Sequence, residues 1–394
     1  MSHKQLLITP ESLGPYVRSR AGGKGANLHT MTKAGLHVPE WFVLPTTAFE
    51  NFITLKGLTG FLEDALKKDP KEAEKIIEAK FLEAKMPEDL AALIISNWES
   101  RLDRSMISVR SSAADEDGSS HSFAGQLSSY LYLDDANSIV SSVLKCWASA
   151  FSERGLSYRA QNKISNQGIK VAVVLQQMID PEISGVMFTQ DPTKPAKAAI
   201  MINAVYGVGE GLVGGHLDPD SWTLSPEGEV IDANIVDKDK HWIQKDGGGC
   251  HEQALPKVIS EPCLSPAQLK DLAQLAQKIE HLYRFPQDVE WAIKDGKIWL
   301  LQSRPITTGV VSHQGHLFVW DNSNIVESYG GLTKPLTFGF ARYVYHQVYV
   351  QFCEVLMVPQ AHIKEMNFFL SNMLGLFYGR VYYNLLNWYK LTSI

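Results

Sequence analysis

Cysteine is scarce and scattered in this sequence. Only four cysteines occur in 394 residues, and no two of them form a CxxC pair. This spacing argues against a zinc site and against a disulfide framework. The sequence also has no apolar run of roughly 18 residues, the length of a membrane-spanning helix. Its start, MSHKQLLITPESLG, lacks the apolar core of a signal peptide. We therefore expect a cytoplasmic protein with no membrane contact.

Positive charge is outnumbered by negative charge. Lys and Arg total 37 against 43 Asp and Glu, which gives a net charge of -6. We therefore expect no nucleic-acid partner, although a local basic pocket could still hold an anion. The hydrophobic fraction of 45% and the charged fraction of 20% are those of a globular protein, and the length allows two or three domains.

Strand and helix patterns alternate through most of the chain. Apolar segments typical of buried strands include VAVVLQQMI at 171–179 and AAIMINAVYG at 198–207. Ser265 and Pro266 are typical N-cap and N1 residues of a helix, and apolar residues follow them at helical spacing. This interleaving predicts an α/β or α+β fold in two lobes.

Two segments contain residues suited to binding phosphate. The first is Gly22-Gly23-Lys24-Gly25, whose glycines let backbone amides approach an anion while Lys24 adds positive charge. Its spacing is not that of a P-loop. The second contains Arg110, at the end of a short apolar strand, where its planar guanidinium could bind phosphate oxygens. Taken alone, each segment also fits a plain surface turn or an exposed arginine.

Two further residues could contact a ligand. Gly125 closes the polar loop after Arg110 and would allow close backbone approach, although a simple turn explains it equally well. Gln176 lies inside the buried strand 171–179, where its amide needs a hydrogen-bond partner. Either a ligand or neighbouring backbone could supply that partner.

A predicted hairpin around Asp295-Gly296 carries Asp288, Glu290, Gln302 and Arg304. Carboxylate and amide oxygens are ligands that Mg²⁺ prefers, so one face of this hairpin could hold the metal. A two-residue loop would place Glu290 and Gln302 on opposite faces, whereas a three-residue loop would place them together. We predict the three-residue loop; a solvated polar face with a salt bridge is the alternative.

Five motifs in order resemble one enzyme family. They are GGKGANL…AGLHVPEWFVLPTTAF, SVRSSAADED…SFAGQ, VAVVLQQMI…SGVMFTQDP, GVGEGLVGG…DPDSW and DVEWAIKDGKIWLLQSRPIT. This succession is similar to the ATP-binding domain of the pyruvate phosphate dikinase and phosphoenolpyruvate synthase family, which includes rifampicin phosphotransferases. The resemblance implies an α+β, ATP-grasp fold with ATP and Mg²⁺ between two lobes.

The resemblance also implies roles for individual residues. Lys24 and Arg110 match residues that hold the nucleotide phosphates, and Arg304 matches an arginine at the terminal phosphates; these three are the expected catalytic residues. Glu290 and Gln302 match the pair that contacts metal and ATP. The remaining matches are nucleotide contacts, namely Gly125, Ser129 and Gln176. Ser129 replaces a more usual threonine and keeps the hydroxyl.

In that family the domain transfers the β-phosphoryl group of ATP to a histidine on a swivelling domain, with release of AMP and phosphate. None of the 12 histidines here lies in the family's phosphohistidine motif; His313 is nearest but lacks glycine-rich flanks. The resemblance therefore implies a chain incomplete for turnover: either a natural half-protein with a partner phosphohistidine domain, or a truncated one. The last residues, NWYKLTSI, have no domain-closing character, which favours truncation. The alternatives are an antibiotic kinase of the rifampicin phosphotransferase type, an ATP-grasp ligase that yields ADP, and a non-catalytic nucleotide-binding relic.

Aromatic residues concentrate at the end of the chain, where 17 of the 39 lie between His316 and Ile394. We expect lobes at 1–190 and 191–308, a linker at 309–316, and the start of a further, mainly helical domain at 317–394. Tyr345, Tyr349 and Phe352 fall on one helical stripe. We expect an exposed apolar patch in this last segment.

Overall fold

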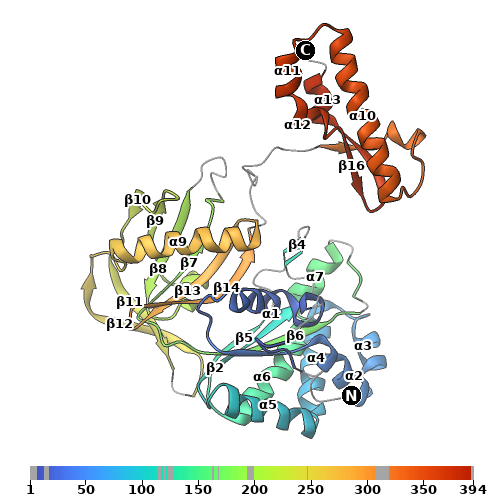
Figure 1. The fold of residues 1–394 in the computed structure, drawn as a ribbon. Coiled ribbons are helices and arrows are strands. Elements are labelled where there is room, and N and C mark those ends of the chain that lie inside the picture. Colours follow the sequence, from blue (N-terminus) through green and yellow to red (C-terminus); the bar gives the residue numbers. More distant parts are fainter. Residues whose placement is uncertain are drawn as a thin grey trace. The chain divides into compact units, whose positions relative to one another are not determined.

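Two compact units, Met1–Val311 and Ser312–Ile394, make up the chain, and each is described by itself. Their separation falls within the segment expected to be a linker. In this computed structural model (Figure 1), the described residues are 7–12, 17–113, 117–118, 121–122, 128–161, 164–166, 168–192, 199–245, 247–306 and 319–391.

The first unit begins with a four-stranded sheet in the order β1-β6-β2-β5. These strands are β1 (Trp41–Leu44), β6 (Val171–Gln177), β2 (Ile107–Ala113) and β5 (Ser129–Leu133), and neighbouring strands are antiparallel. Strand β6 is central and buried on both faces, which explains its nearly continuous apolar sequence.

Alternate residues of this sheet enter two different cores. Val173 and Leu175 pack among the helices on one face, whereas Ala172 and Val174 pack against α1 (Val17–Lys33) on the other. Because side chains alternate along a strand, Gln176 belongs to the same face as Val174. The helices of the first core are α2 (Thr46–Leu55), α3 (Thr59–Ala65), α4 (Pro70–Ala84), α5 (Glu88–Arg101), α6 (Ala136–Ser149) and α7 (Glu153–Gln161).

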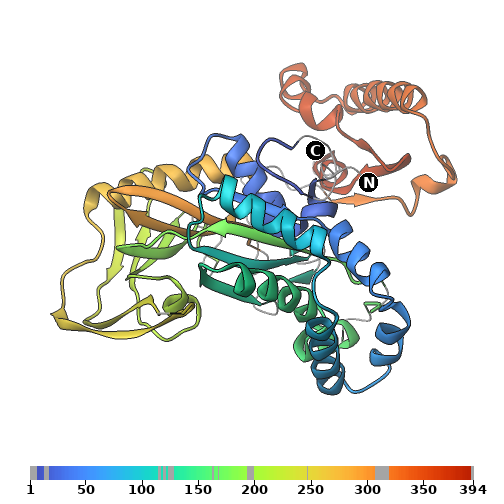
Figure 2. The ribbon, with the colours of Figure 1, turned by 90° about the horizontal axis from the view of Figure 1, so that it is seen from below.

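A six-stranded sheet in the order β10-β9-β8-β7-β13-β14 forms the second lobe. Helix α9 (Pro266–Tyr283) lies along one face of it (Figures 1 and 2). Ser265 caps this helix in a capping box with Gln268, which confirms the predicted helix start. The strands are β7 (Ile183–Phe188), β8 (Ile200–Tyr206), β9 (Asp220–Leu224), β10 (Val230–Asn234), β13 (Gln287–Lys294) and β14 (Lys297–Pro305).

The chain passes from the first sheet to the second before residue 190, where we expected the boundary between the lobes. Strand β7 already pairs with β13 and β8 of the second sheet, so the boundary lies between Gln177 and Ile183. The apolar sequence of β7 resembles that of the preceding strand, and pairing partners are not visible in sequence. Three smaller elements complete this unit: α8 (Glu210–Val213), the ribbon of β11 (Lys238–Gln244) with β12 (Cys250–Ile259), and the short pair β3 (Asp117–Gly118) with β4 (His121–Ser122).

Helix α1 joins the two lobes. The Asn27 side-chain amide donates a hydrogen bond of 2.6 Å to the Ser303 carbonyl on β14, and the Tyr283 hydroxyl donates one of 3.1 Å to the Asn27 carbonyl. Ala21, Leu28 and other apolar residues of α1 share one core with the second sheet. The first helix is therefore positioned by both sheets.

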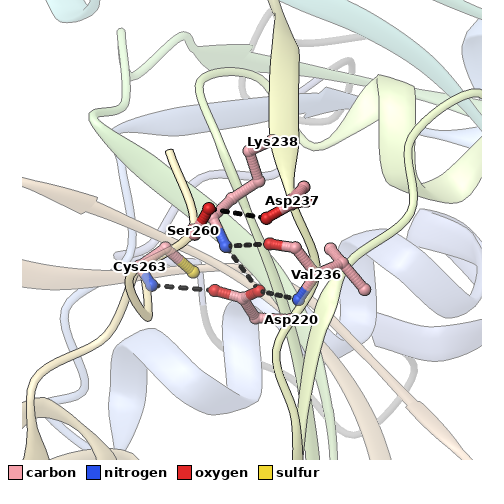
Figure 3. Close-up of polar contacts among 6 residues, drawn as sticks. All are labelled: Asp220, Val236, Asp237, Lys238, Ser260 and Cys263. Atoms are coloured by element: carbon pink, nitrogen blue, oxygen red, sulfur yellow. Dashed lines mark hydrogen bonds and ion pairs between the residues drawn. The ribbon is translucent and has the colours of Figure 1, made fainter. Parts of the chain in front are cut away.

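A buried ion pair holds the outer part of the second lobe together (Figure 3). The Lys238 ammonium lies 2.6 Å from the Asp220 carboxylate, and both side chains are almost fully buried. Asp220 also accepts hydrogen bonds from the backbone amides of Val236, at 3.0 Å, and Cys263, at 2.8 Å. This carboxylate thus links β9, the start of β11 and the segment that leads into α9.

The second unit combines helices with a small sheet. Its longest element is α10 (Pro335–Val355), followed by α11 (Gln360–Glu365), α12 (Asn367–Leu370) and α13 (Leu385–Leu391); a 3-10 turn covers Ile325–Glu327. The three-stranded sheet β15-β17-β16 was not expected, because strands of two to five residues leave little periodicity in sequence. They are β15 (Trp320–Asp321), β16 (Leu374–Phe377) and β17 (Arg380–Asn384).

The aromatic residues of this unit have two environments. Tyr345 and Tyr349 are half-buried beside small apolar cores, whereas Phe352 is exposed, so the expected common stripe divides between two faces of α10. Many large apolar side chains of the unit are exposed, as expected. Among the described residues, no helix is both long and apolar enough to cross a membrane.

Candidate functional site

Arg110 and Glu290 connect the two sheets of the first unit. Nη2 of Arg110, on β2, lies 3.0 Å from the Glu290 carboxylate on β13, and both side chains are largely buried. Nε of Arg110 is buried and has no hydrogen-bond partner in the described part of the chain. An unpaired guanidinium donor at this depth has an unmet interaction that an anionic ligand could satisfy.

The hairpin that carries Glu290 has a two-residue turn, so the predicted three-residue loop is wrong. Lys294 pairs with Lys297, and Asp295 and Gly296 both have positive φ, 50° and 70°, as in a type I′ turn. With this turn and regular pairing, Glu290 and Gln302 would lie on opposite faces of the hairpin, and the metal interpretation would fail.

A β-bulge nevertheless places Glu290 and Gln302 on the same face of the hairpin. Glu290 pairs with Gln302 but Trp291 pairs with Leu300, so Leu301 is an extra residue on β14. One extra residue reverses the side-chain parity of everything beyond it. Glu290 and Gln302 are therefore direct cross-strand neighbours after all, and so are Asp288 and Arg304.

The second pair of the hairpin is also close. Nε of Arg304 donates a hydrogen bond of 2.8 Å to the Asp288 carboxylate. Burial raises the pKa of Asp288, as does the nearby Glu290 carboxylate, whereas Arg304 opposes this shift. Gln302 is buried, and its Oε1 has no partner among the described residues. This face thus offers carboxylate and amide oxygens beside two arginines.

Gln176 and Ser129 lie on strands that flank Arg110. Gln176 pairs with Ser108 on β2, and its Nε2 is buried with no hydrogen-bond partner in the structure described. Among the described residues, the neighbouring backbone therefore does not supply a hydrogen-bond partner for this Nε2. Ser129 on β5 is directly opposite Arg110 and is exposed. Gly125 lies outside the described residues.

Lys24 lies near the middle of α1, just after a kink at Gly22, where this helix packs closely against β2. The Ser112 hydroxyl donates a hydrogen bond of 2.8 Å to the Ala21 carbonyl and accepts one of 3.2 Å from the Gly25 amide. Gly22 has φ 70° and ψ -179°, a conformation favourable only for glycine. This arrangement brings the glycine cluster to the strand that carries Arg110.

Replacing Gly22 by alanine is expected to destabilise this contact. A Cβ at Gly22 would lie 2.2 Å from the Ser112 carbonyl oxygen, whereas one at Gly35, with similar φ of 72°, would meet nothing within 4 Å. Gly35→Ala should cost about 1 kcal/mol from backbone strain alone, and Gly22→Ala roughly 2 kcal/mol because overpacking adds to the strain. Urea unfolding of both variants measures the difference. Equal losses of unfolding free energy in the two variants would contradict the close contact between Gly22 and Ser112.

Glu210, in the glycine-rich motif GVGEGLVGG, is a site residue that the sequence did not predict. Burial raises its pKa; Arg110 and His216 lower it, and Glu290 raises it. Glu210 is therefore close enough to interact with the Arg110–Glu290 pair. Its helix, α8, is held by close contacts: a Cβ at Gly211 would lie 2.7 Å from the Trp242 ring. A single glutamate between glycines carries no pattern that could have marked it.

Glu210→Gln is expected to stabilise the apoprotein at neutral pH, but only slightly, because Glu210 is partly exposed and solvent screens its charge. Because the folded pKa is raised, the folded state binds the proton more tightly than the unfolded state, and the ionised carboxylate opposes folding. The gain should therefore be present at pH 7 and shrink as the pH falls towards the ordinary glutamate value of 4.5. Urea unfolding with chelator across this range tests it, with Glu227→Gln, in the turn between β9 and β10, as the control. A gain that does not depend on pH would contradict the effect of burial.

The donor set fits ATP with Mg²⁺. Within the described residues, no group of three or more His, Cys, Asp or Glu side chains could hold a metal by itself. Mg²⁺ usually binds one or two protein carboxylates together with substrate phosphates, so it does not need such a cluster. The Glu290 carboxylate and the unpaired Oε1 of Gln302 are suitable ligands, and the unpaired Nε of Arg110 is a suitable phosphate donor.

Comparison with known proteins identifies the domain. Residues 18–317 match the family model described as "Pyruvate phosphate dikinase, AMP/ATP-binding domain". A probable phosphoenolpyruvate synthase of Methanothermobacter thermautotrophicus is 35% identical over 311 residues, which are 76% of this chain and 45% of that protein.

Two further relatives carry other names. A prodigiosin synthesizing transferase of Serratia marcescens is 37% identical over 305 residues, 77% of this chain and 33% of that protein. A rifampicin phosphotransferase of a Streptomyces species is 34% identical over 313 residues, 77% of this chain and 36% of that protein. The matched stretch is thus less than half of each relative. The extent of the family match and the order of the site residues lead to one conclusion: this chain belongs to the pyruvate phosphate dikinase family of phosphotransferases and carries its ATP-binding domain.

Proposed function

We propose that this domain binds ATP with Mg²⁺ and transfers the β-phosphoryl group of ATP to a histidine on a partner domain. With water as co-reactant, the products are AMP, phosphate and phosphohistidine. The observation that supports this proposal is the set of three buried, unpaired polar atoms around the Arg110–Glu290 pair: Arg110 Nε, Gln176 Nε2 and Gln302 Oε1. They offer donors and an acceptor for a polar, charged ligand.

Each site residue has a role in this proposal. Lys24, Arg110 and Arg304 would neutralise phosphate charge, which is the main requirement of phosphoryl transfer. Asp288 would hold Arg304 in place through the 2.8 Å hydrogen bond. Glu290 and Gln302 would hold Mg²⁺, which would supply positive charge that neutralises the phosphates. Gln176, Ser129 and Gly125 would contact the nucleotide.

We propose the acceptor of the phosphoryl group from the names of the relatives. Two of them are named as a probable phosphoenolpyruvate synthase and a rifampicin phosphotransferase. We propose a phosphohistidine swivelling domain, in the same chain or a separate one, as the immediate acceptor. A synthase-type final acceptor is the first choice and an antibiotic the second. A cytoplasmic location remains a prediction from the sequence.

Nucleotide binding and product identity test this function. Calorimetric titration of the chain alone should show ATP binding that depends on Mg²⁺, without net turnover. When a separately produced phosphohistidine domain is added, chromatography should show AMP and phosphate in equal amounts. Absence of ATP binding would overturn the proposal, and ADP as the sole nucleotide product would favour an ATP-grasp ligase instead.

A further inference from the structure

Asn27, on α1, is a buried polar residue to which the proposed function gives no role. Its side-chain amide donates a hydrogen bond of 2.6 Å to the Ser303 carbonyl on β14, and both residues are buried. Strand β14 is the last strand of the six-stranded sheet, so part of its backbone has no neighbouring strand to bond. Asn27 therefore joins α1 to the edge of the sheet that carries the hairpin of the proposed site.

Ser303 lies between two proposed site residues, Gln302 and Arg304. Because side chains alternate along a strand, the Ser303 side chain is on the opposite face of the hairpin from theirs. Its hydroxyl donates a hydrogen bond of 2.9 Å to the side chain of Gln287 on β13, which is also buried. The hydrogen bond from Asn27 thus holds the backbone between Gln302 and Arg304 from behind, and the polar contacts continue into the other strand of the hairpin.

The same turn of α1 is fixed to the strand that carries Arg110. The Gly25 amide donates a hydrogen bond of 3.2 Å to the hydroxyl of Ser112, two residues after Arg110 on β2. Lys24 comes just before Gly25 and three residues before Asn27, so Lys24 and Asn27 are neighbours on the helix surface. One turn of α1, which contains Lys24, is therefore attached both to β2 and to β14.

We propose that Asn27 is a positioning residue, which fixes the spacing between Lys24 and Arg304 so that both can bind phosphate oxygens of one ATP molecule. This inference rests on the proposed function. The side-chain amide of Asn27 donates to the Ser303 carbonyl, so Asn27 acts on the ligand through the residues that it holds. Two groups on different elements bind one ligand well when their separation is fixed beforehand, because ordering them on binding costs affinity.

A double-mutant cycle of ATP affinity tests this role. Calorimetric titration with ATP and Mg²⁺ is carried out on Asn27→Ala in the wild-type, Lys24→Met and Arg304→Met backgrounds. In the wild-type background, Asn27→Ala should weaken ATP binding about tenfold, which is the cost of ordering one long side chain on binding. In the other two backgrounds the loss should shrink to less than about twofold, because the spacing matters only while both groups bind.

Trp98→Phe is the control for loss of stability alone. Trp98, on α5 in the helical core of the first lobe, is also buried and donates a side-chain hydrogen bond of 2.8 Å to a main-chain carbonyl, that of Ser105. Trp98→Phe should lower the free energy of unfolding in urea and leave ATP affinity unchanged. If Asn27→Ala does not fold, Asn27→Asp takes its place, because it keeps the side-chain shape and loses the amide donor.

The possible outcomes separate this inference from the proposed function. Absence of ATP binding in the wild-type chain would overturn both. If the wild-type chain binds ATP, an Asn27→Ala loss of the same size in all three backgrounds, or no loss in any of them, would overturn the positioning role alone. An equal loss of ATP affinity in Trp98→Phe would also overturn it, since reduced stability would then explain both variants.

Discussion

Replacing Arg110 by methionine is expected to weaken ATP binding by about 100-fold, since hydrogen bonds to charged groups contribute about 1.5–3 kcal/mol. The side chain stays near its original volume but loses every donor. Its loss also leaves the Glu290 carboxylate, now 3.0 Å from Nη2 of Arg110, without a partner beside the phosphates. Calorimetric titration with ATP measures the change. The matched control is Arg101→Met, which removes a partly buried arginine outside the site that is paired with the exposed Glu11.

A second variant separates the two effects of losing Arg110. In Arg110→Met with Glu290→Gln, the repulsion between carboxylate and phosphate is gone, so without Mg²⁺ this variant should bind ATP more tightly than Arg110→Met alone. With Mg²⁺ the advantage should disappear, because the proposed metal ligand is also lost. If Mg²⁺ does not change the ratio of the ATP affinities of the two variants, Glu290 is not a metal ligand. Unchanged affinity in Arg110→Met would place the phosphates elsewhere.

Asp220→Ala is expected to destabilise the second lobe by about 3–5 kcal/mol, the usual effect of breaking a buried ion pair. The substitution removes three interactions, with Lys238 and with the amides of Val236 and Cys263 (Figure 3). It also leaves a buried ammonium whose remaining hydrogen bond, within the described part of the chain, is to the Val236 carbonyl at 2.7 Å. Lys238→Met should have a smaller effect, because Asp220 keeps both backbone donors.

The same strand provides the control for this prediction. Lys240 on β11 forms a similar ion pair with Glu252, at 2.9 Å, but in solvent. Lys240→Met should therefore have little measurable effect on stability. Hydrogen exchange at β9 and β11 during urea titration reports on this lobe alone, which avoids assuming that both units unfold together. Equal protection in Asp220→Ala and Lys240→Met would show that burial does not strengthen the Asp220 pair.

Much of the fold was accessible from local sequence. The capping residues Ser265 and Pro266 marked the start of α9, and the apolar run of β6 marked a strand buried on both faces. These features depend on neighbouring residues, so a sequence records them directly. The ordered motifs likewise identified the ATP-binding domain, which the family match over residues 18–317 confirms.

Only part of the candidate site could be predicted from the sequence. Arg110, Glu290, Gln302 and Arg304 were named from sequence, but their assembly depends on pairing between distant strands. The proximity of Glu210 to them arises from the packing of α8 against Trp242, which no local pattern records. Strand β7 was assigned to the wrong lobe for the same reason.

The hairpin shows most clearly where sequence and tertiary structure divide. The sequence alone determined that carboxylate, amide and guanidinium groups alternate with apolar residues on two consecutive strands. Tertiary structure decided which of them face each other, through a two-residue turn and an extra residue at Leu301. Because side chains alternate with a period of two, one extra residue exchanges the two faces of a strand. Its position depends on how β14 pairs with β13, and that pairing exists only in the folded chain.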